Sequence, residues 1–201
     1  RADVTNFLRA CRRAAGLQTR GGVVGVPGPG PTRGNEQTAR TDQDSDGHGG
    51  REVRVAAFPI SIDTAGLGEL ARRGDVGARA RRIRAELGDP DIVLLGVDRL
   101  DYTKGIPHRL KAYEELLDGG RLGPPQAVFV QVAGPSRERV AQYQLLRAEV
   151  EGIVGRINGK HATLGQPAVH YLHHAYPREE IAALYLAADV MLVTSLRDGM
   201  N

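Results

Sequence analysis

Short apolar runs alternate with amphipathic segments over residues 91–194, and this alternation restricts the possible folds more than any other feature of the sequence. The runs Ile92–Val97 and Ala127–Val132 are rich in branched apolar residues, as is typical of strands that are covered on both faces. Val169–Leu172 and Val190–Thr194 continue the series. We therefore predict an α/β fold with a parallel sheet and helices on both of its faces.

Helical spacing of apolar residues separates the four predicted strands. The first intervening helix is predicted over 106–118, with its end at the pair Gly119–Gly120. The second is predicted to have Ser136 as its N-cap and to end at the pair Asn158–Gly159. The third is predicted over Arg178–Ala188.

The composition changes sharply over residues 19–51, which contain nine glycines and three prolines. Three valines are the only large apolar residues there, so the segment cannot bury enough surface to offset its conformational entropy. We predict a disordered insertion over these residues. Around it, the pattern predicts a helix over 3–15 and a strand over 53–58, followed by an extended connector over 58–63.

Composition and charge exclude several classes of protein. Apolar residues make up 41% of the chain and charged residues 25%, which are proportions typical of a globular protein. Lys and Arg number 27 against 24 for Asp and Glu, and a net charge of +3 is too small for a dedicated nucleic-acid-binding protein. The basic run Arg79–Arg84 has apolar partners at helical spacing and is interpreted as the solvent side of an amphipathic helix.

The cellular compartment follows from three features. No stretch approaches the roughly 18 uninterrupted apolar residues of a membrane span, and the beginning of the chain lacks a secretory signal pattern. The single cysteine, Cys11, cannot form an internal disulfide, which fits a reducing compartment. We expect a cytoplasmic protein that binds neither membrane nor nucleic acid. The oligomeric state stays open, and a homo-oligomer is compatible with the sequence.

The loops after the strands are the expected position of a ligand, because open parallel sheets bind ligands in the crevice outside the carboxyl ends of their strands. These loops are Asp98–Lys104, Gly134–Arg137, His173–Pro177 and Ser195–Asn201. The residue types that carry chemistry collect in the same four segments.

Two of these loops bring cations to the start of a predicted helix. Arg99 and Lys104 lie in the first loop, and Arg137 lies in the second. Because the free amides and the dipole of a helix N-terminus also favour an anion, each corner fits a phosphate. Two such corners on one sheet edge suggest a phosphorylated substrate and a phosphorylated co-substrate. The alternative is that the cations form surface salt bridges with acidic residues of the same loops.

The last loop reads SLRDGMN and contains Asp198, followed by Gly199 with its unobstructed backbone amide. A carboxylate and exposed amides together suit sugar hydroxyls, which need both an acceptor and donors. The alternative is an ordinary turn, since Asp-Gly is a common turn sequence.

Three further patterns are set aside. The acidic residues in 42–46 match the front of a calcium loop, but Val53 stands where the bidentate Glu is needed. The histidines within 170–174 do not share one face of the strand, and no cysteine accompanies them. Cys11 lies on an apolar helical stripe and is interpreted as a core thiol. We expect no metal ligands.

Several motifs in register resemble the trehalose-6-phosphate synthase family. They are VDRLDYTKGI (97–106), PSRE (135–138), GRINGK (155–160) and ADVMLVTSLRDGMN (188–201), with FPISID (58–63) and NFLRACRRAAG (6–16) upstream. The resemblance covers nearly all of the chain except the insertion, and four motifs in the family's order are far more specific than any one of them.

The resemblance implies a retaining glycosyltransferase of the GT-B type, built from two facing Rossmann-like domains and truncated here at both ends. Residues 1–57 would be the tail of the N-terminal acceptor domain, and residues 58–201 an incomplete C-terminal nucleotide-sugar-binding domain. The implied reaction moves glucose from UDP-glucose to glucose 6-phosphate, giving trehalose 6-phosphate and UDP without a metal ion or other cofactor. Because half of the crevice is missing, we expect no turnover by these 201 residues alone.

The resemblance also implies roles for individual residues. Arg99 and Lys104 would hold the donor diphosphate, and Arg137 would bind the acceptor phosphate. Tyr176 would lie at the uridine side through its backbone. The donor glucose would be held by the last loop, whose residues are Asp198, Gly199, Met200 and Asn201. Arg99, Lys104 and Asp198 would form the catalytic set, and the leaving phosphate itself would accept the proton of the acceptor hydroxyl.

Two alternatives stay open at this point. One is a related sugar-phosphate glycosyltransferase, such as a glucosylglycerol-phosphate synthase, because the visible loops do not fix the acceptor or the nucleotide. The other is a non-catalytic regulatory homologue that binds sugar phosphates. The intact cations at Arg99, Lys104 and Arg137 favour the enzyme.

Overall fold

The computed structural model describes residues 2–26, 51–56 and 61–196. The chain divides into two compact units, Arg1–Ile62 and Asp63–Asn201, which we call unit 1 and unit 2 and describe separately. Every helix within the described ranges is too short or too polar to cross a lipid bilayer.

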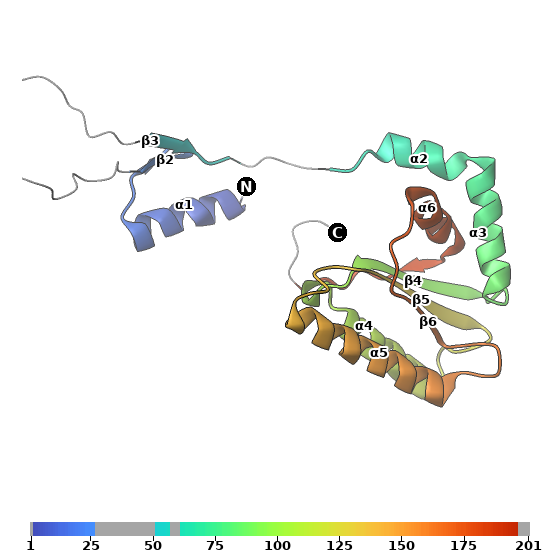
Figure 1. Ribbon diagram of the computed structural model, residues 1–201. Coiled ribbons are helices and arrows are strands. Elements are labelled where there is room, and N and C mark those ends of the chain that lie inside the picture. The colour runs from blue at the N-terminus through green and yellow to red at the C-terminus, as the bar shows by residue number, and fades with distance from the viewer. Residues whose placement is uncertain (1, 27–50, 57–60, 197–201) are drawn as a thin grey trace, which may run out of the picture. The chain divides into compact units, whose positions relative to one another are not determined.

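Unit 1 combines one helix with a small antiparallel sheet (Figure 1). The predicted helix is confirmed as α1 (Ala2–Ala15), which ends at Gly16 in the left-handed region with φ 64°. The strands β1 (Thr19–Arg20), β2 (Val23–Val26) and β3 (Arg51–Arg54) follow in the order β1-β2-β3.

The predicted insertion therefore begins too early, because residues 19–20 and 23–26 lie in strands. Gly21 and Gly22 have φ values of 56° and 85°, which fit a two-residue hairpin turn between β1 and β2. Val24 pairs with Val53 of β3 and is buried. A pairing between residues so distant in sequence is invisible to local composition, and residues 27–50 lie outside the described ranges. The strand predicted over 53–58 is found at 51–54, and residues 57–60 are also not described.

Unit 2 is an α/β layer structure around one parallel sheet, which confirms the predicted fold class. After α2 (Thr64–Arg72) and α3 (Gly74–Glu86), four parallel strands occur in the spatial order β6-β5-β4-β7. Their bounds are β4 (Ile92–Arg99), β5 (Ala127–Gly134), β6 (Val169–Leu172) and β7 (Val190–Met191). The short 3-10 helix η1 (Tyr102–Lys104) precedes α4 (Ile106–Asp118), and α5 (Ala141–His161) and α6 (Arg178–Ala187) complete the unit.

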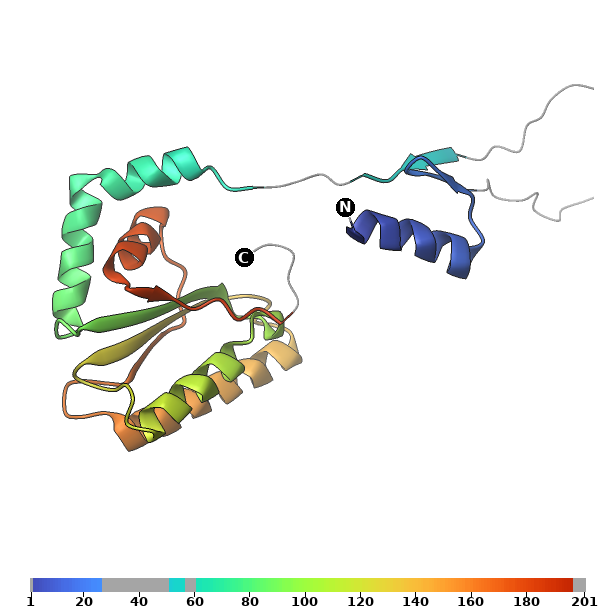
Figure 2. The same cartoon turned by 180° about the vertical axis from the view of Figure 1, so that it is seen from behind.

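The helices cover both faces of the sheet, as Figures 1 and 2 show from opposite sides. On the face under α4 and α5, Leu94 and Phe129 belong to one buried cluster. On the face under α2, α3 and α6, Val93 and Val130 belong to a second cluster. Alternate residues of each strand are thus buried on opposite faces of the sheet. This explains why the strands appear in the sequence as continuous apolar runs.

The long helix α5 differs from its prediction at both ends. It begins at Ala141 with Val140 as its cap, because Arg137 takes a left-handed φ of 47° that interrupts the predicted first turn after Ser136. At the other end it continues to His161. The side chain of Asn158 exchanges two hydrogen bonds of 2.9 Å with the backbone of Val169, so a contact with β6 fixes this residue within the helix.

The strand order places the candidate site. From β4 the chain moves outward to β5 and β6 and then returns to β7 on the other side of β4. The order therefore reverses between β4 and β7, and such a switch point opens a crevice outside the carboxyl ends of the two strands. The strand predicted over 190–194 pairs with β4 only over 190–191, and Leu192 adds one hydrogen bond from its amide to the Leu95 carbonyl at 2.8 Å.

Candidate functional site

Arg99 and Lys104 lie at the carboxyl end of β4, where the sequence predicted them. Arg99 is the last residue of the strand and is exposed, next to Gly134 at the end of β5. Lys104 ends η1 and is buried, with 7% of its surface exposed. Gly105 follows in the left-handed region with φ 67° and is the N-cap of α4, so the lysine immediately precedes a helix N-terminus.

Asp101 orders the loop between β4 and α4. Its Oδ1 accepts hydrogen bonds from the Thr103 amide at 3.0 Å and from the Thr103 hydroxyl at 2.9 Å. Its Oδ2 accepts a hydrogen bond from the Tyr143 hydroxyl at 3.1 Å. Burial raises the pKa of Asp101, but these hydrogen bonds and the nearby charge of Arg137 together lower it by a larger amount. The pKa of Asp101 is therefore below its usual value.

The loops after β4 and β7 are joined by direct hydrogen bonds. The Leu196 amide donates to the Thr103 carbonyl at 2.7 Å, and the Thr194 hydroxyl donates to the Lys104 carbonyl at 3.3 Å. A Cβ atom at Gly105 would lie 2.4 Å from the Thr194 carbonyl oxygen, so only glycine fits this approach. Segments about ninety residues apart in sequence are therefore held together beside the switch point.

Arg109 of α4 forms a buried network beneath this contact, and sequence reasoning missed it. The side chain is 1% exposed and pairs through Nη1 with Asp98 Oδ2 at 2.7 Å. The same Nη1 donates to Gln131 Oε1 at 2.9 Å, and Nε donates to the Thr194 hydroxyl at 3.1 Å. The network links β4, β5 and the segment after β7. A signal was present, since Arg109 lies on the apolar face of its helix, three residues after Ile106.

Gly96 in the middle of β4 provides the space for this network. A Cβ atom there would lie 2.2 Å from Arg109 Nη1 and 2.5 Å from Gln131 Oε1. The glycine within an otherwise branched strand is thus explained by the buried arginine.

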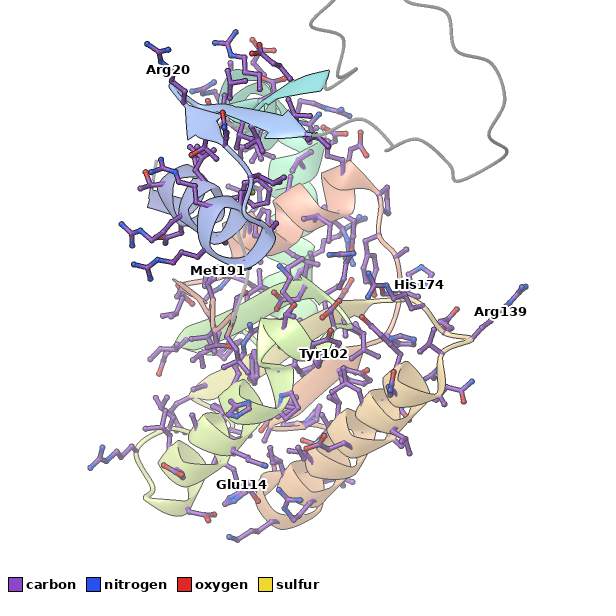
Figure 3. All side chains as sticks on the ribbon, turned by 90° about the vertical axis from the view of Figure 1, so that its left-hand side faces the viewer. Arg20, Tyr102, Glu114, Arg139, His174 and Met191 are labelled. Atoms are coloured by element: carbon purple, nitrogen blue, oxygen red, sulfur yellow. The ribbon has the colours of Figure 1, made fainter. Side chains whose placement is uncertain are left out.

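Arg137 lies in the loop after β5 and contacts Tyr143 of α5. Its Nη1 donates a hydrogen bond of 2.5 Å to the Tyr143 hydroxyl, and its Cζ lies 5.4 Å from the centre of the Tyr143 ring. Burial and the hydrogen bond to Asp101 raise the pKa of Tyr143. Tyr102 also contacts the Tyr143 ring edge-on, with 6.0 Å between ring centres. Figure 3 faces the carboxyl ends of the strands and shows Tyr102 among these loops of unit 2.

The acidic residues of the same loops have partners other than the three predicted cations. Asp98 pairs with Arg109, and Glu138 lies 3.4 Å from His173 Nε2. Asp101 and Arg137 are both hydrogen-bonded to the Tyr143 hydroxyl. These contacts weaken the alternative in which Asp98, Asp101 and Glu138 neutralise the cations as simple surface salt bridges.

The loop after β6 lies beside the end of β5 at the same edge of the sheet. His173 Nδ1 lies 2.9 Å from the Ala133 carbonyl oxygen, and its ring stacks on Tyr171 with 6.3 Å between centres. Tyr176 packs against the core under α3 and α6, where it lines a cavity of about 250 Å³ together with His170. Burial lowers the pKa of His170. Among the described residues, no group of three His, Cys, Asp or Glu side chains could hold a metal ion.

The predicted sugar-binding residues Asp198, Gly199, Met200 and Asn201 lie outside the described residues, whose last member is Leu196. A cavity of about 200 Å³ opens beside the second loop, and Ser136, Tyr143 and His173 contribute to its lining. The described edge thus brings Arg99, Lys104 and Arg137 together around the ends of β4 and β5. Such an arrangement can bind more than one phosphoryl group.

Comparison with known proteins identifies similar chains. The model of glycosyltransferase family 20 matches residues 1–201. The trehalose-6-phosphate synthase of Mycobacterium avium is 54% identical over 196 residues, and that of Mycobacterium tuberculosis strain H37Rv is 51% identical. Each alignment covers 98% of this chain and 37% of the relative, so the chain spans little more than a third of their length.

Solved structures agree with these sequence relatives. A UDP-forming alpha,alpha-trehalose-phosphate synthase from Burkholderia xenovorans, in complex with glucose-6-phosphate, has a TM-score of 0.79 at 33% identity. The match covers 100% of this chain and 39% of that one. An E. coli structure bound with UDP-2-fluoro glucose has a TM-score of 0.67 at 35% identity, covering 75% of this chain and 33% of that one. The predicted GT-B type of fold is confirmed by these matches.

Proposed function

The chain belongs to glycosyltransferase family 20, and on that premise we propose that it takes part in trehalose 6-phosphate synthesis. Glucose would pass from UDP-glucose to glucose 6-phosphate with retention at the anomeric carbon, and UDP would be released. The observation that carries the proposal is the position of Arg99, Lys104 and Arg137 at one carboxyl edge of the sheet, beside the switch point.

Electrostatics explains how the donor side would work. Breaking the bond between the anomeric carbon and the phosphate places negative charge on the departing diphosphate. The cations Arg99 and Lys104 would therefore stabilise the transition state more than the bound substrate. Lys104 is buried and precedes the amides of α4, so little solvent would need to reorganise around it.

The acceptor side would depend on Arg137. Its guanidinium lies at the loop after β5, one strand away from the donor cations, so two phosphorylated ligands could meet over the ends of β4 and β5. The donor glucose would lie between them, held by Asp198 and the amides of residues 199–201. The leaving phosphate would accept the proton of the acceptor hydroxyl, and Tyr176 would border the uridine through its backbone.

The domain assignment and the site of action belong to the same proposal. Residues 1–57 would belong to the acceptor domain and residues 58–201 to the nucleotide-sugar domain. Because relatives are more than twice as long, we expect the 201 residues by themselves to give no turnover. We place the reaction in the cytoplasm, since both substrates are charged metabolites that do not cross a membrane unaided.

An assay of the full-length gene product tests the proposal. Incubation with UDP-glucose and glucose 6-phosphate should yield trehalose 6-phosphate and UDP in equal amounts. Arg99→Ala and Lys104→Ala should each lower kcat by about a hundredfold or more, the scale for a lost donor that stabilises transition-state charge. Arg121→Ala is the matched control, because Arg121 is exposed and lies before β5, at the opposite edge of the sheet.

The alternatives predict different results from the same assay. Transfer with GDP-glucose or ADP-glucose but not UDP-glucose would change the donor, and transfer to another sugar phosphate or to glycerol phosphate would change the acceptor. Binding of sugar phosphates without any transfer would instead support a regulatory homologue. Full activity in both Arg99→Ala and Lys104→Ala would contradict the proposed role of this edge.

A further inference from the structure

A chain of hydrogen bonds connects the two loops that carry the proposed phosphate-binding cations. Arg137 Nη1 donates to the Tyr143 hydroxyl at 2.5 Å, and that hydroxyl donates to Asp101 Oδ2 at 3.1 Å. A tyrosine hydroxyl has one proton to donate, and an ionised carboxylate only accepts, so the direction of the chain is fixed. Tyr143 is buried, and its aromatic ring also lies beneath the Arg137 guanidinium.

We propose that Tyr143 and Asp101 are positioning residues that hold Arg137 ready for the phosphate of the acceptor and couple it to the donor loop. The inference rests on the proposed function, and it assigns to Tyr143 a role that none of the sequence motifs indicated. Neither residue needs to touch a substrate, because each would act through the arginine.

The Arg137 side chain needs contacts with other residues to stay in one conformation. The residue is exposed, and its backbone φ of 47° lies in a region that non-glycine residues rarely adopt. A long arginine side chain on an exposed loop samples many rotamers unless contacts restrict it. The Tyr143 hydroxyl restrains one nitrogen and the ring restrains the guanidinium plane, while the guanidinium has further N–H donors with which to bind a phosphate.

The coupling arises because one oxygen of Asp101 binds its own loop and the other binds Tyr143 of α5. Oδ1 accepts from the amide and the hydroxyl of Thr103, within η1, which ends at Lys104. Oδ2 accepts from Tyr143 and so determines where Arg137 is held. A donor that orders the loop around Lys104 would therefore also order the acceptor-binding arginine. The two substrates should bind with positive cooperativity.

The substitution Tyr143→Phe in the full-length gene product tests the inference, since it keeps the ring and removes the hydroxyl. We expect the KM for glucose 6-phosphate to rise about tenfold, the scale for losing a hydrogen bond to a charged group. The Kd for UDP-glucose measured in the absence of glucose 6-phosphate should change little, because the coupling acts only when both substrates are bound. Tyr113→Phe is the matched control. It also removes a buried tyrosine hydroxyl, which donates to the Ala168 carbonyl at 3.2 Å in the core under α4. The KM values of this control should stay at wild-type level.

A second variant shows whether Tyr143 acts through the arginine. In an Arg137→Ala background, Tyr143→Phe should have no further effect on the KM for glucose 6-phosphate, because the two changes remove the same interaction. Strictly additive effects, or equal effects of Tyr143→Phe and Tyr113→Phe, would overturn the inference while leaving the proposed function intact. A wild-type protein that transfers no glucose and binds no glucose 6-phosphate would instead overturn the proposed function and this inference together.

Discussion

At the scale of single residues, hydrogen bonds decide the charge state of Asp101. Burial alone would favour the protonated carboxyl group, but the hydrogen bonds from Thr103 and Tyr143 and the charge of Arg137 lower its pKa. The ionised form is the one that accepts hydrogen bonds from Thr103 of its own loop and from Tyr143 of α5. Asp101 therefore contributes to stability and to site geometry through the same contacts.

The stability of the protein should depend on pH through this residue. Because the pKa of Asp101 is lower in the folded state, its ionised form adds stability at neutral pH, and this contribution is lost as the pH falls below about 4. Asp101→Asn should therefore unfold at lower urea concentration than the wild type at pH 7. The difference between the two urea midpoints should become smaller in acid. Asp91→Asn, at an exposed position, controls for the loss of one negative charge. A difference that widens in acid would contradict this account.

The buried charge of Arg109 leads to a second prediction. Arg109→Met leaves Asp98 buried without its partner, and breaking such a pair costs about 3 to 5 kcal/mol in the free energy of unfolding. Arg147→Met is the matched control, because Arg147 pairs with Glu151 on the surface of α5, where solvent screens the interaction. Urea unfolding of both variants, followed by circular dichroism, gives the comparison. Similar losses in the two variants would mean that the network does not stabilise the switch point.

At the scale of helices and strands, the sequence predicted the middle of each element better than its first and last residues. The strands that begin at Ile92 and Ala127 were recognisable because both of their faces are apolar. The predicted start of α5 was wrong because Arg137 takes a left-handed backbone conformation, which no local pattern reveals. Its predicted end was wrong because Asn158 bonds to β6. Local propensity alone does not set these boundaries.

Two glycine substitutions should have opposite effects on the strand and helix that contain them. Gly96→Ala in β4 would place a methyl group 2.2 Å from Arg109 Nη1, so the buried network must shift and stability should fall. Gly155→Ala in α5 meets no atom within 4 Å and should raise the free energy of unfolding by about 0.5 to 1 kcal/mol, because alanine favours the helix. Thermal unfolding of the two variants distinguishes these outcomes. Stabilisation by Gly96→Ala would show that the strand does not need the space.

At the scale of the whole molecule, the alternation of strands and helices predicted the parallel sheet, and the motif order predicted the family. The strand order β6-β5-β4-β7 could not be predicted from the sequence, because it depends on which side of β4 the strand β7 joins. The small sheet of unit 1 was missed because its strands β2 and β3 come from distant segments. In the site, the positions of Arg99, Lys104 and Arg137 were predictable from their loops, whereas Arg109 and Tyr143 act through contacts that only the fold creates.

Unit 2 should fold without unit 1. Both of its buried clusters consist entirely of residues within Asp63–Asn201, and the sheet is covered on its two faces by helices of the same unit. The polypeptide 63–201 should therefore unfold cooperatively in urea, at a midpoint close to that of the corresponding transition in the 201-residue chain. A non-cooperative transition would show that the unit depends on the preceding residues.

Titration of the isotope-labelled chain with UDP, followed by amide chemical shifts, tests the central claim most directly. If the cations at the end of β4 bind the donor diphosphate, the amides of Arg99–Gly105 and Thr194–Leu196 should shift in a saturable manner. The Lys104→Ala variant should need a much higher UDP concentration for the same shifts, while Arg121→Ala should behave like the wild type. The absence of saturable shifts in these two segments, or equal affinity in the Lys104→Ala variant, would contradict the account.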